Sequence, residues 1–146
     1  ITGNLLVTGD ITAFYSDERL KEKTEDIKDV LPILNNIDTF KYKNNELANS
    51  LGFNNDNQQI GLSAQQIREY YPELIELAPF DTTFDNLNNK KSISGNEYLT
   101  IKYDRLVPIL LQGIKELNNK NKILEERNIN FENELNIIKE QLKKLV

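Results

Sequence analysis

The sequence predicts an α+β fold class: a small domain of short strands and helices, followed by a long C-terminal helix that forms a coiled coil. Two observations predict it. Strand-like and helix-like patterns alternate along the first part of the 146-residue chain, separated by Asn-rich stretches. From Val107 to Leu145, apolar residues then recur 3 and 4 residues apart with almost no interruption, and a sustained heptad is typical of coiled coils.

Composition excludes several classes of function. His and Cys are both absent, which removes Ser-His-Asp triads, thiol catalysis, disulfides and metal sites with imidazole or thiolate ligands. We therefore expect no metal and no cofactor. The net charge of −5 argues against a nucleic-acid partner, which needs a basic face. No apolar run approaches the roughly 20 residues of a membrane span. Because the first residue is not Met, we expect a piece of a longer chain.

The N-terminus carries a repeat. It consists of two hexads, Ile1–Leu6 and Val7–Thr12. In both, the first five residues are, in order, a β-branched residue, Thr, Gly, either Asn or Asp, and an aliphatic residue. Gly beside Asn or Asp supplies turn chemistry, and the flanking residues suit strands. Two hexads cannot bury their own apolar face, so they require stacked repeats or neighbouring chains. We interpret 1–15 as the end of a β-structured shaft, with a single hairpin as the alternative.

The segment 16–105 predicts the α+β domain. Apolar residues at helical spacing predict a helix over about 25–35, which Pro32 distorts. Ser63 is expected to cap a second helix that ends before Pro72. Strand-forming residues predict strands, and Asn-rich composition predicts loops. The expected strands are 39–43, 60–62, 74–77 and 98–103, and the expected loops are 44–58 and 81–96.

The segment 106–146 predicts an intermolecular coiled coil. Its heptad has Val107 at position a and Leu110 at position d. Every a and d position is apolar except Asn121 and Asn128, which both occupy a. A buried Asn at a fixes the register and the number of helices at a cost in stability. The a and d residues do not decide between two and three strands. A long helix folded back on its own domain is the alternative.

Ser16 and Lys21 are the candidate catalytic pair. Without His and Cys, a serine becomes a nucleophile when a neutral lysine takes its proton. Free lysine has a pKa of about 10.4, so burial has to lower it first. In one continuous helix the two side chains would point about 140° apart, so Ser16 has to lie outside the helix, or Lys21 has to come from a neighbouring chain. The alternative is that Ser16 is only the N-cap of a solvated helix.

Four blocks, in order along the chain, resemble the S74 peptidase family, the intramolecular chaperone domains at the C-termini of phage tail spikes and fibres. The first block, SDERLK at Ser16–Lys21, is similar to the family signature. The blocks that follow are TFKY at 39–42, IGLSAQQI at 60–67 with YPELI at 71–75, and YLTIKYDRLVPIL at 98–110. One position departs from the family pattern, which usually has Glu where this chain has Gln66.

The resemblance implies a mechanism. Three copies would assemble as a parallel trimer, help the upstream fibre portion of the same chain to fold, and then cut the Tyr15–Ser16 bond. Ser16 would be the nucleophile and Lys21 the base. The fibre would join the virion tail, and the domain would be released into the host cytoplasm during assembly. A missing carboxylate at Gln66 would make cleavage slow or abolish it. The possible supporting residues are Asp17, Glu18, Arg19 and Gln66.

Other functions stay open. The same trimer could be an uncleaved structural tip of a fibre. It could also be the trimerising, self-cleaving domain of a membrane-anchored transcription-factor-like protein, which the family includes. An unrelated coiled-coil adaptor is a further alternative. The shaft-like hexads favour a fibre over the membrane-anchored alternative. For the favoured function we expect three parts, a shaft end at 1–15, a chaperone domain at 16–105 and a coil at 106–146, with no nucleic acid or membrane as a partner.

Overall fold

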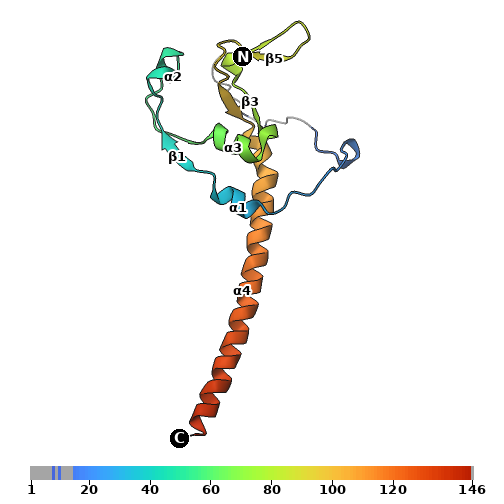
Figure 1. The fold of residues 1–146 in the computed structure, drawn as a ribbon, viewed down its shortest axis with the longest axis vertical. Coiled ribbons are helices and arrows are strands. Elements are labelled where there is room, and N and C mark those ends of the chain that lie inside the picture. Colours follow the sequence, from blue (N-terminus) through green and yellow to red (C-terminus); the bar gives the residue numbers. More distant parts are fainter. Residues whose placement is uncertain (1–7, 9, 11–14, 146) are drawn as a thin grey trace.

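The computed structural model describes residues 8, 10 and 15–145 (Figure 1). The predicted N-terminal repeat therefore lies outside the described residues. The described chain is α+β, as predicted: a small body of short elements packs against one end of a single long helix, α4 (Leu106–Lys143). Below the body, α4 continues alone to the C-terminus (Figure 1). The C-terminal part is therefore helical, and it does not fold back on its own domain.

The strands of the body are short and pair only two by two among the described residues. Each pair is antiparallel: β1 (Thr39–Tyr42) with β2 (Gln59–Leu62), β3 (Ile75–Leu77) with β6 (Leu99–Ile101), and β4 (Thr82–Phe84) with β5 (Lys90–Ser92). The other elements are α1 (Val30–Asn35), α2 (Glu46–Ser50), α3 (Ala64–Tyr70) and the 3-10 turns η1 (Glu18–Leu20), η2 (Pro72–Leu74), η3 (Pro79–Asp81) and η4 (Tyr103–Arg105). Two-stranded sheets are marginally stable alone, so the helices have to supply much of the core.

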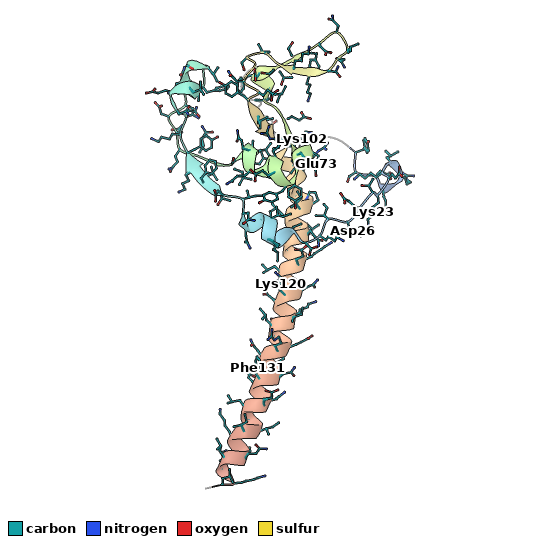
Figure 2. All side chains as sticks on the ribbon, viewed as in Figure 1. Lys23, Asp26, Glu73, Lys102, Lys120 and Phe131 are labelled. Atoms are coloured by element: carbon teal, nitrogen blue, oxygen red, sulfur yellow. The ribbon has the colours of Figure 1, made fainter. Side chains whose placement is uncertain are left out.

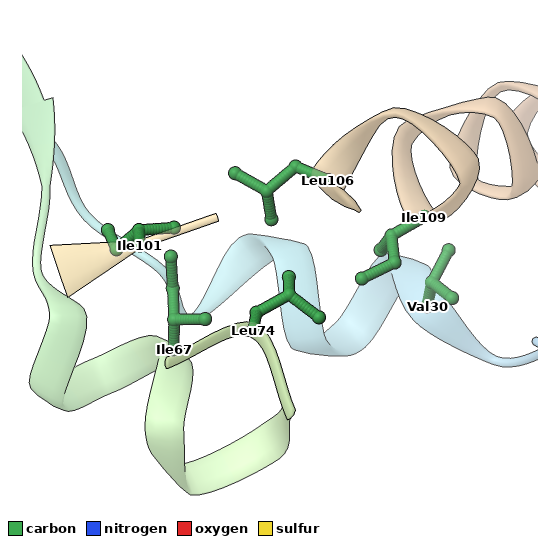
Figure 3. Close-up of a cluster of buried hydrophobic side chains, with 6 residues drawn as sticks. All are labelled: Val30, Ile67, Leu74, Ile101, Leu106 and Ile109. Atoms are coloured by element: carbon green, nitrogen blue, oxygen red, sulfur yellow. The ribbon is translucent and has the colours of Figure 1, made fainter. Parts of the chain in front are cut away.

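The core lies where the body meets α4 (Figure 3). Burial of each such aliphatic side chain stabilises the fold by about 1.5–3 kcal/mol. The first turns of α4 thus belong to the same packing unit as the body. The buried cluster consists of Val30 from α1, Ile67 from α3, Leu74 from η2, Ile101 from β6, and Leu106 and Ile109 from α4.

Helix α1 packs closely on α4 at Gly113. A Cβ atom there would lie 2.8 Å from Leu34 Cδ1 and 3.4 Å from Val30 Cγ2. Glu116, one turn further along α4, caps α1 by accepting hydrogen bonds from the backbone N–H groups of Val30 (3.0 Å) and Leu31 (3.3 Å). Hydrogen bonds from the Gln112 side chain and from this helix terminus keep the pKa of Glu116 below its ordinary value. A glycine and a carboxylate on α4 therefore fix the position of α1.

The helix predicted over 25–35 begins only at Val30. Asp29 has left-handed backbone torsion angles (φ 54°) and makes no side-chain cap, so the chain before it runs without regular structure. Pro32 is the third residue of α1, where its missing N–H would have had no partner within the helix. The prediction for α3 is confirmed, because Ser63 Oγ accepts from the N–H of Gln66 and Pro72 follows the end of the helix.

Two segments predicted as loops contain regular structure. The first, 44–58, contains α2, which Asn45 caps through its side chain. The second, 81–96, contains the β4–β5 hairpin, which is held by the buried Asp81. The Asp81 carboxylate accepts hydrogen bonds from Ser92 Oγ (2.7 Å) and from the backbone N–H groups of Ser94 (2.7 Å) and Tyr98 (3.0 Å). Desolvation raises the pKa of Asp81, but these hydrogen bonds outweigh it and bring the pKa to about 2.

We predict that Gly113→Ala destabilises the protein by about 1–3 kcal/mol, because the new methyl group would overlap Leu34. Helix propensity alone predicts the opposite sign, since Ala is favoured over Gly by about 1 kcal/mol inside a helix. Thermal unfolding at matched protein concentration measures the difference. Asn119→Ala, on an exposed part of α4, is the control and should leave stability unchanged or slightly raised. A stabilised Gly113→Ala variant would show that α1 does not press on α4.

Candidate active site

Ser16 and Lys21 meet within one chain. The Lys21 Nζ atom lies 2.8 Å from Ser16 Oγ and donates a hydrogen bond to it. Only Glu18–Leu20 between them is helical, and this is a tight 3-10 turn, after which Lys21 has extended torsion angles. The side chains therefore do not diverge as they would in a continuous α-helix. Ser16 lies outside the turn, which is the geometry that the sequence required for a contact inside one chain.

Asp17 and Arg19 shape the turn that brings the two residues together. Asp17, not Ser16, is the N-cap: its Oδ1 accepts from the backbone N–H of Arg19 at 2.9 Å. The guanidinium of Arg19 also donates hydrogen bonds to the same carboxylate, with Nε 3.0 Å from Oδ1 and Nη2 2.6 Å from Oδ2. The side-chain hydrogen bond from Arg19 is the main cause that lowers the pKa of Asp17. Because Asp17 takes the capping role, the Ser16 hydroxyl is left to Lys21. Glu18 is exposed in the same turn.

The Ser16–Lys21 pair is exposed in a single chain. Figure 2 shows the segment that follows it, with Lys23 and Asp26, leading back toward α4 from a turn that stands to the side of the body. An exposed lysine is a cation at neutral pH and donates hydrogen bonds, whereas a general base has to accept the serine proton. The distance between the two groups therefore suits the chemistry, but the solvation of a single chain does not. Lys21 lines a hollow of about 450 Å³ together with Tyr15, Asp104, Arg105 and Pro108.

Gln66 lies in a different place from the Ser16–Lys21 pair and has other partners. Its Nε2 donates to Asp38 Oδ2 at 2.8 Å, and its Oε1 accepts from the backbone N–H of Asp38 at 3.1 Å. Asp38 immediately precedes β1, so the two hydrogen bonds join the first turn of α3 to the start of that strand. In one chain, Gln66 therefore acts on the fold. Its predicted role as a supporting residue of the site stays a prediction.

A second candidate surface is the a and d face of α4. Figure 2 shows one of its members, Phe131, on the part of α4 that extends beyond the body. Asn121 and Asn128 are exposed on the same helix. An apolar stripe this long is more than a monomer usually exposes. Its apolar members, each at least half exposed, are Val107, Leu110, Ile114, Leu117, Leu124, Phe131, Leu135, Ile138, Leu142 and Leu145.

Residues 16–76 match the family model Peptidase_S74, described as chaperone of endosialidase. The match begins at Ser16 and ends within β3, so it includes the Ser16–Lys21 turn, α1, the β1–β2 pair and α3. The block at 98–110 and α4 lie beyond it. No curated protein sequence matches the chain. In the described residues, no helix is both long enough and apolar enough to cross a membrane.

We predict that Gln66→Glu destabilises the protein at neutral pH. The introduced side chain could no longer donate to Asp38 and would place a second carboxylate against it, and like charges at this range oppose ionisation. The unfolding temperature should fall relative to wild type at pH 7 and recover below about pH 4, where carboxyl groups become protonated. Gln65→Glu, at the exposed neighbouring position, is the matched control. Equal unfolding temperatures for the two variants at pH 7 would contradict the prediction.

Proposed function

We propose, from the S74 assignment of residues 16–76, that this chain is an intramolecular chaperone of a viral tail fibre or spike that trimerises and then cuts its own Tyr15–Ser16 bond. The family supports a chaperone role and is a peptidase family with autocleaving members. The observation that carries the proposal is the 2.8 Å approach of Lys21 Nζ to Ser16 Oγ in a chain without His or Cys.

The proposed reaction needs only Tyr15, Ser16, Lys21 and one water. Neutral Lys21 takes the proton of Ser16 Oγ, and the oxygen attacks the carbonyl carbon of Tyr15. The C–N bond of the Tyr15–Ser16 peptide breaks as its nitrogen takes the proton back from Lys21, which leaves an ester on Oγ and a free α-amino group on Ser16. Water then hydrolyses the ester and restores the hydroxyl. The reaction is a single turnover, so it requires no pocket for a separate substrate.

The site as it stands in one chain is inactive under this proposal, because Lys21 is exposed. Desolvation disfavours the ammonium form and is the ordinary means by which proteins turn lysine into a base. Contact between copies of the chain would supply this desolvation. Cleavage would then follow assembly, which suits a release step. Because the lysine is exposed and acts as a hydrogen-bond donor in one chain, an uncleaved structural tip of a fibre is a second candidate function.

The position of the body on α4 supports assembly through the a and d face. In the part of α4 that packs against the body, the buried residues are at positions c and g: Ile109 is at c, and Leu106 and Gly113 are at g. Val107 and Leu110, at a and d of the same turns, are at least half exposed. The body thus covers one side of the helix and leaves the coiled-coil side open to other copies along its whole length.

Charges beside this face favour a parallel, in-register arrangement. In such a bundle each g residue faces the e residue five positions further along the neighbouring helix. The pairs are Lys120 with Glu125, Arg127 with Glu132, and Glu134 with Lys139. All three combine opposite charges. An in-register bundle would also place Asn121 against Asn121 of the neighbouring helices, and Asn128 against Asn128, rather than against apolar d residues.

An early trimer would help the upstream segment. Helices form from local contacts quickly, whereas pairing between distant strands is slow and leaves aggregation-prone edges exposed. A coil that joins three chains first would hold their β-structured shafts in register while they pair. The fibre portion would then remain on the virion and the cleaved domain would be released into the host cytoplasm.

We predict that Ser16→Ala and Lys21→Arg both abolish cleavage of the chain expressed with its upstream segment. Alanine has no nucleophilic oxygen, and arginine keeps the charge but cannot lose its proton. Intact mass after purification measures the cut, which should produce a new N-terminus at Ser16 in the wild type. Lys23→Arg is the control and should cleave normally. Cleavage in the alanine variant at the same bond would exclude Ser16 as the nucleophile, and cleavage in the arginine variant would exclude Lys21 as the base.

We predict that Glu132→Arg weakens the trimer by roughly 1–3 kcal/mol, because three exposed g–e pairs become repulsive and each contributes up to about 1 kcal/mol. Adding Arg127→Glu should restore stability by recreating opposite charges between neighbouring helices. Light scattering gives the mass, and thermal unfolding at low salt gives the stability. In an antiparallel bundle g faces g and e faces e, so the double variant would not be rescued. A failed rescue would therefore contradict the parallel register.

A further inference from the structure

Two different groups of residues lie on opposite flanks of the first turns of α4. On the flank of position g, Leu106 and Gly113 are covered by the body, and α1 is seated over Gly113. On the flank of positions b and e, Pro108 lines the hollow that contains Tyr15 and Lys21. The a and d face lies between these two flanks. Leu111, the e residue that follows Pro108 along this flank, is 52% exposed.

A parallel bundle brings these two flanks together. Each helix turns its e flank toward the g flank of the next helix. Since the body lies on the g flank, every copy would turn its body, including α1, toward the e flank of its neighbour. The oppositely charged g–e pairs between Lys120 and Lys139 continue the same two flanks toward the C-terminus. The heptad register therefore determines which part of the neighbouring chain faces the hollow.

We propose that the hollow beside the Ser16–Lys21 pair is closed by the next copy of the chain, through the α1-bearing flank of its body. This inference rests on the trimer of the proposed function and adds the surface that regulates the site. Each copy would hold its own Ser16 and Lys21, because these already meet in one chain, and would receive from its neighbour the apolar cover that Lys21 lacks. Leu111 would be buried in the same contact.

The absence of Cys allows a direct test with single cysteines. Lys21→Cys and Lys23→Cys are compared because both positions are exposed in one chain, and the Leu111→Asp variant below separates cover by another copy from the local surroundings of each thiol. We expect a maleimide to label the thiol at position 21 at least tenfold more slowly than the thiol at position 23 in the full chain. Light scattering on the same samples establishes the trimer.

Two further results decide the outcome. Leu111→Asp, added to Lys21→Cys, should bring labelling at position 21 up to the rate at position 23, while Ile123→Asp, at an exposed position on another side of α4, should not. Equal labelling at the two positions in a chain that is a trimer would overturn this inference and leave the proposed trimer standing. A chain that remains a monomer would overturn the proposed assembly and this inference with it.

Discussion

The close packing of α1 on Gly113 of α4 is the contact on which the rest of the molecule depends. It joins α1 to α4 beside the buried cluster that the body shares with this helix, and Glu116 completes it by capping α1 from α4. Because the body uses only positions c and g, the opposite side of the helix stays continuous. One helix can thus serve as the core of its own domain and as a surface for other copies.

The Ser16–Lys21 pair shows how far local geometry goes toward a catalytic site. A capped 3-10 turn and an Asp17–Arg19 ion pair place the two groups at hydrogen-bonding distance without help from the body. The turn does not provide a dry environment, since its residues are exposed. Distance is therefore encoded within six residues, whereas the desolvation that a lysine base requires is not.

The elements that could be predicted from the sequence are those with local signals. Ser63 and Pro72 mark the ends of α3, and the heptad marks α4 over its whole length. The β4–β5 hairpin was missed because Asp81 holds it through residues up to 17 positions away, which leave no periodic trace. The late start of α1 likewise depends on Glu116, 86 positions along the chain from Val30. At the site, the pair of residues could be predicted, but the capping role of Asp17 and the Gln66–Asp38 contact could not.

Under the proposed reaction, the short distance between Ser16 and Lys21 would also affect what happens after the bond is cut. The new N-terminus would be the α-amino group of Ser16, whose pKa is ordinarily about 7.7–8.0, and it would lie close to the Lys21 amine, since Lys21 Nζ already contacts Ser16 Oγ. Once the product separates and water enters, positive charge on both amines would make them repel each other. Rejoining the chain would require a neutral amine at this position. The turn that favours cleavage would thus oppose its reversal, and the released domain could not reattach to the fibre.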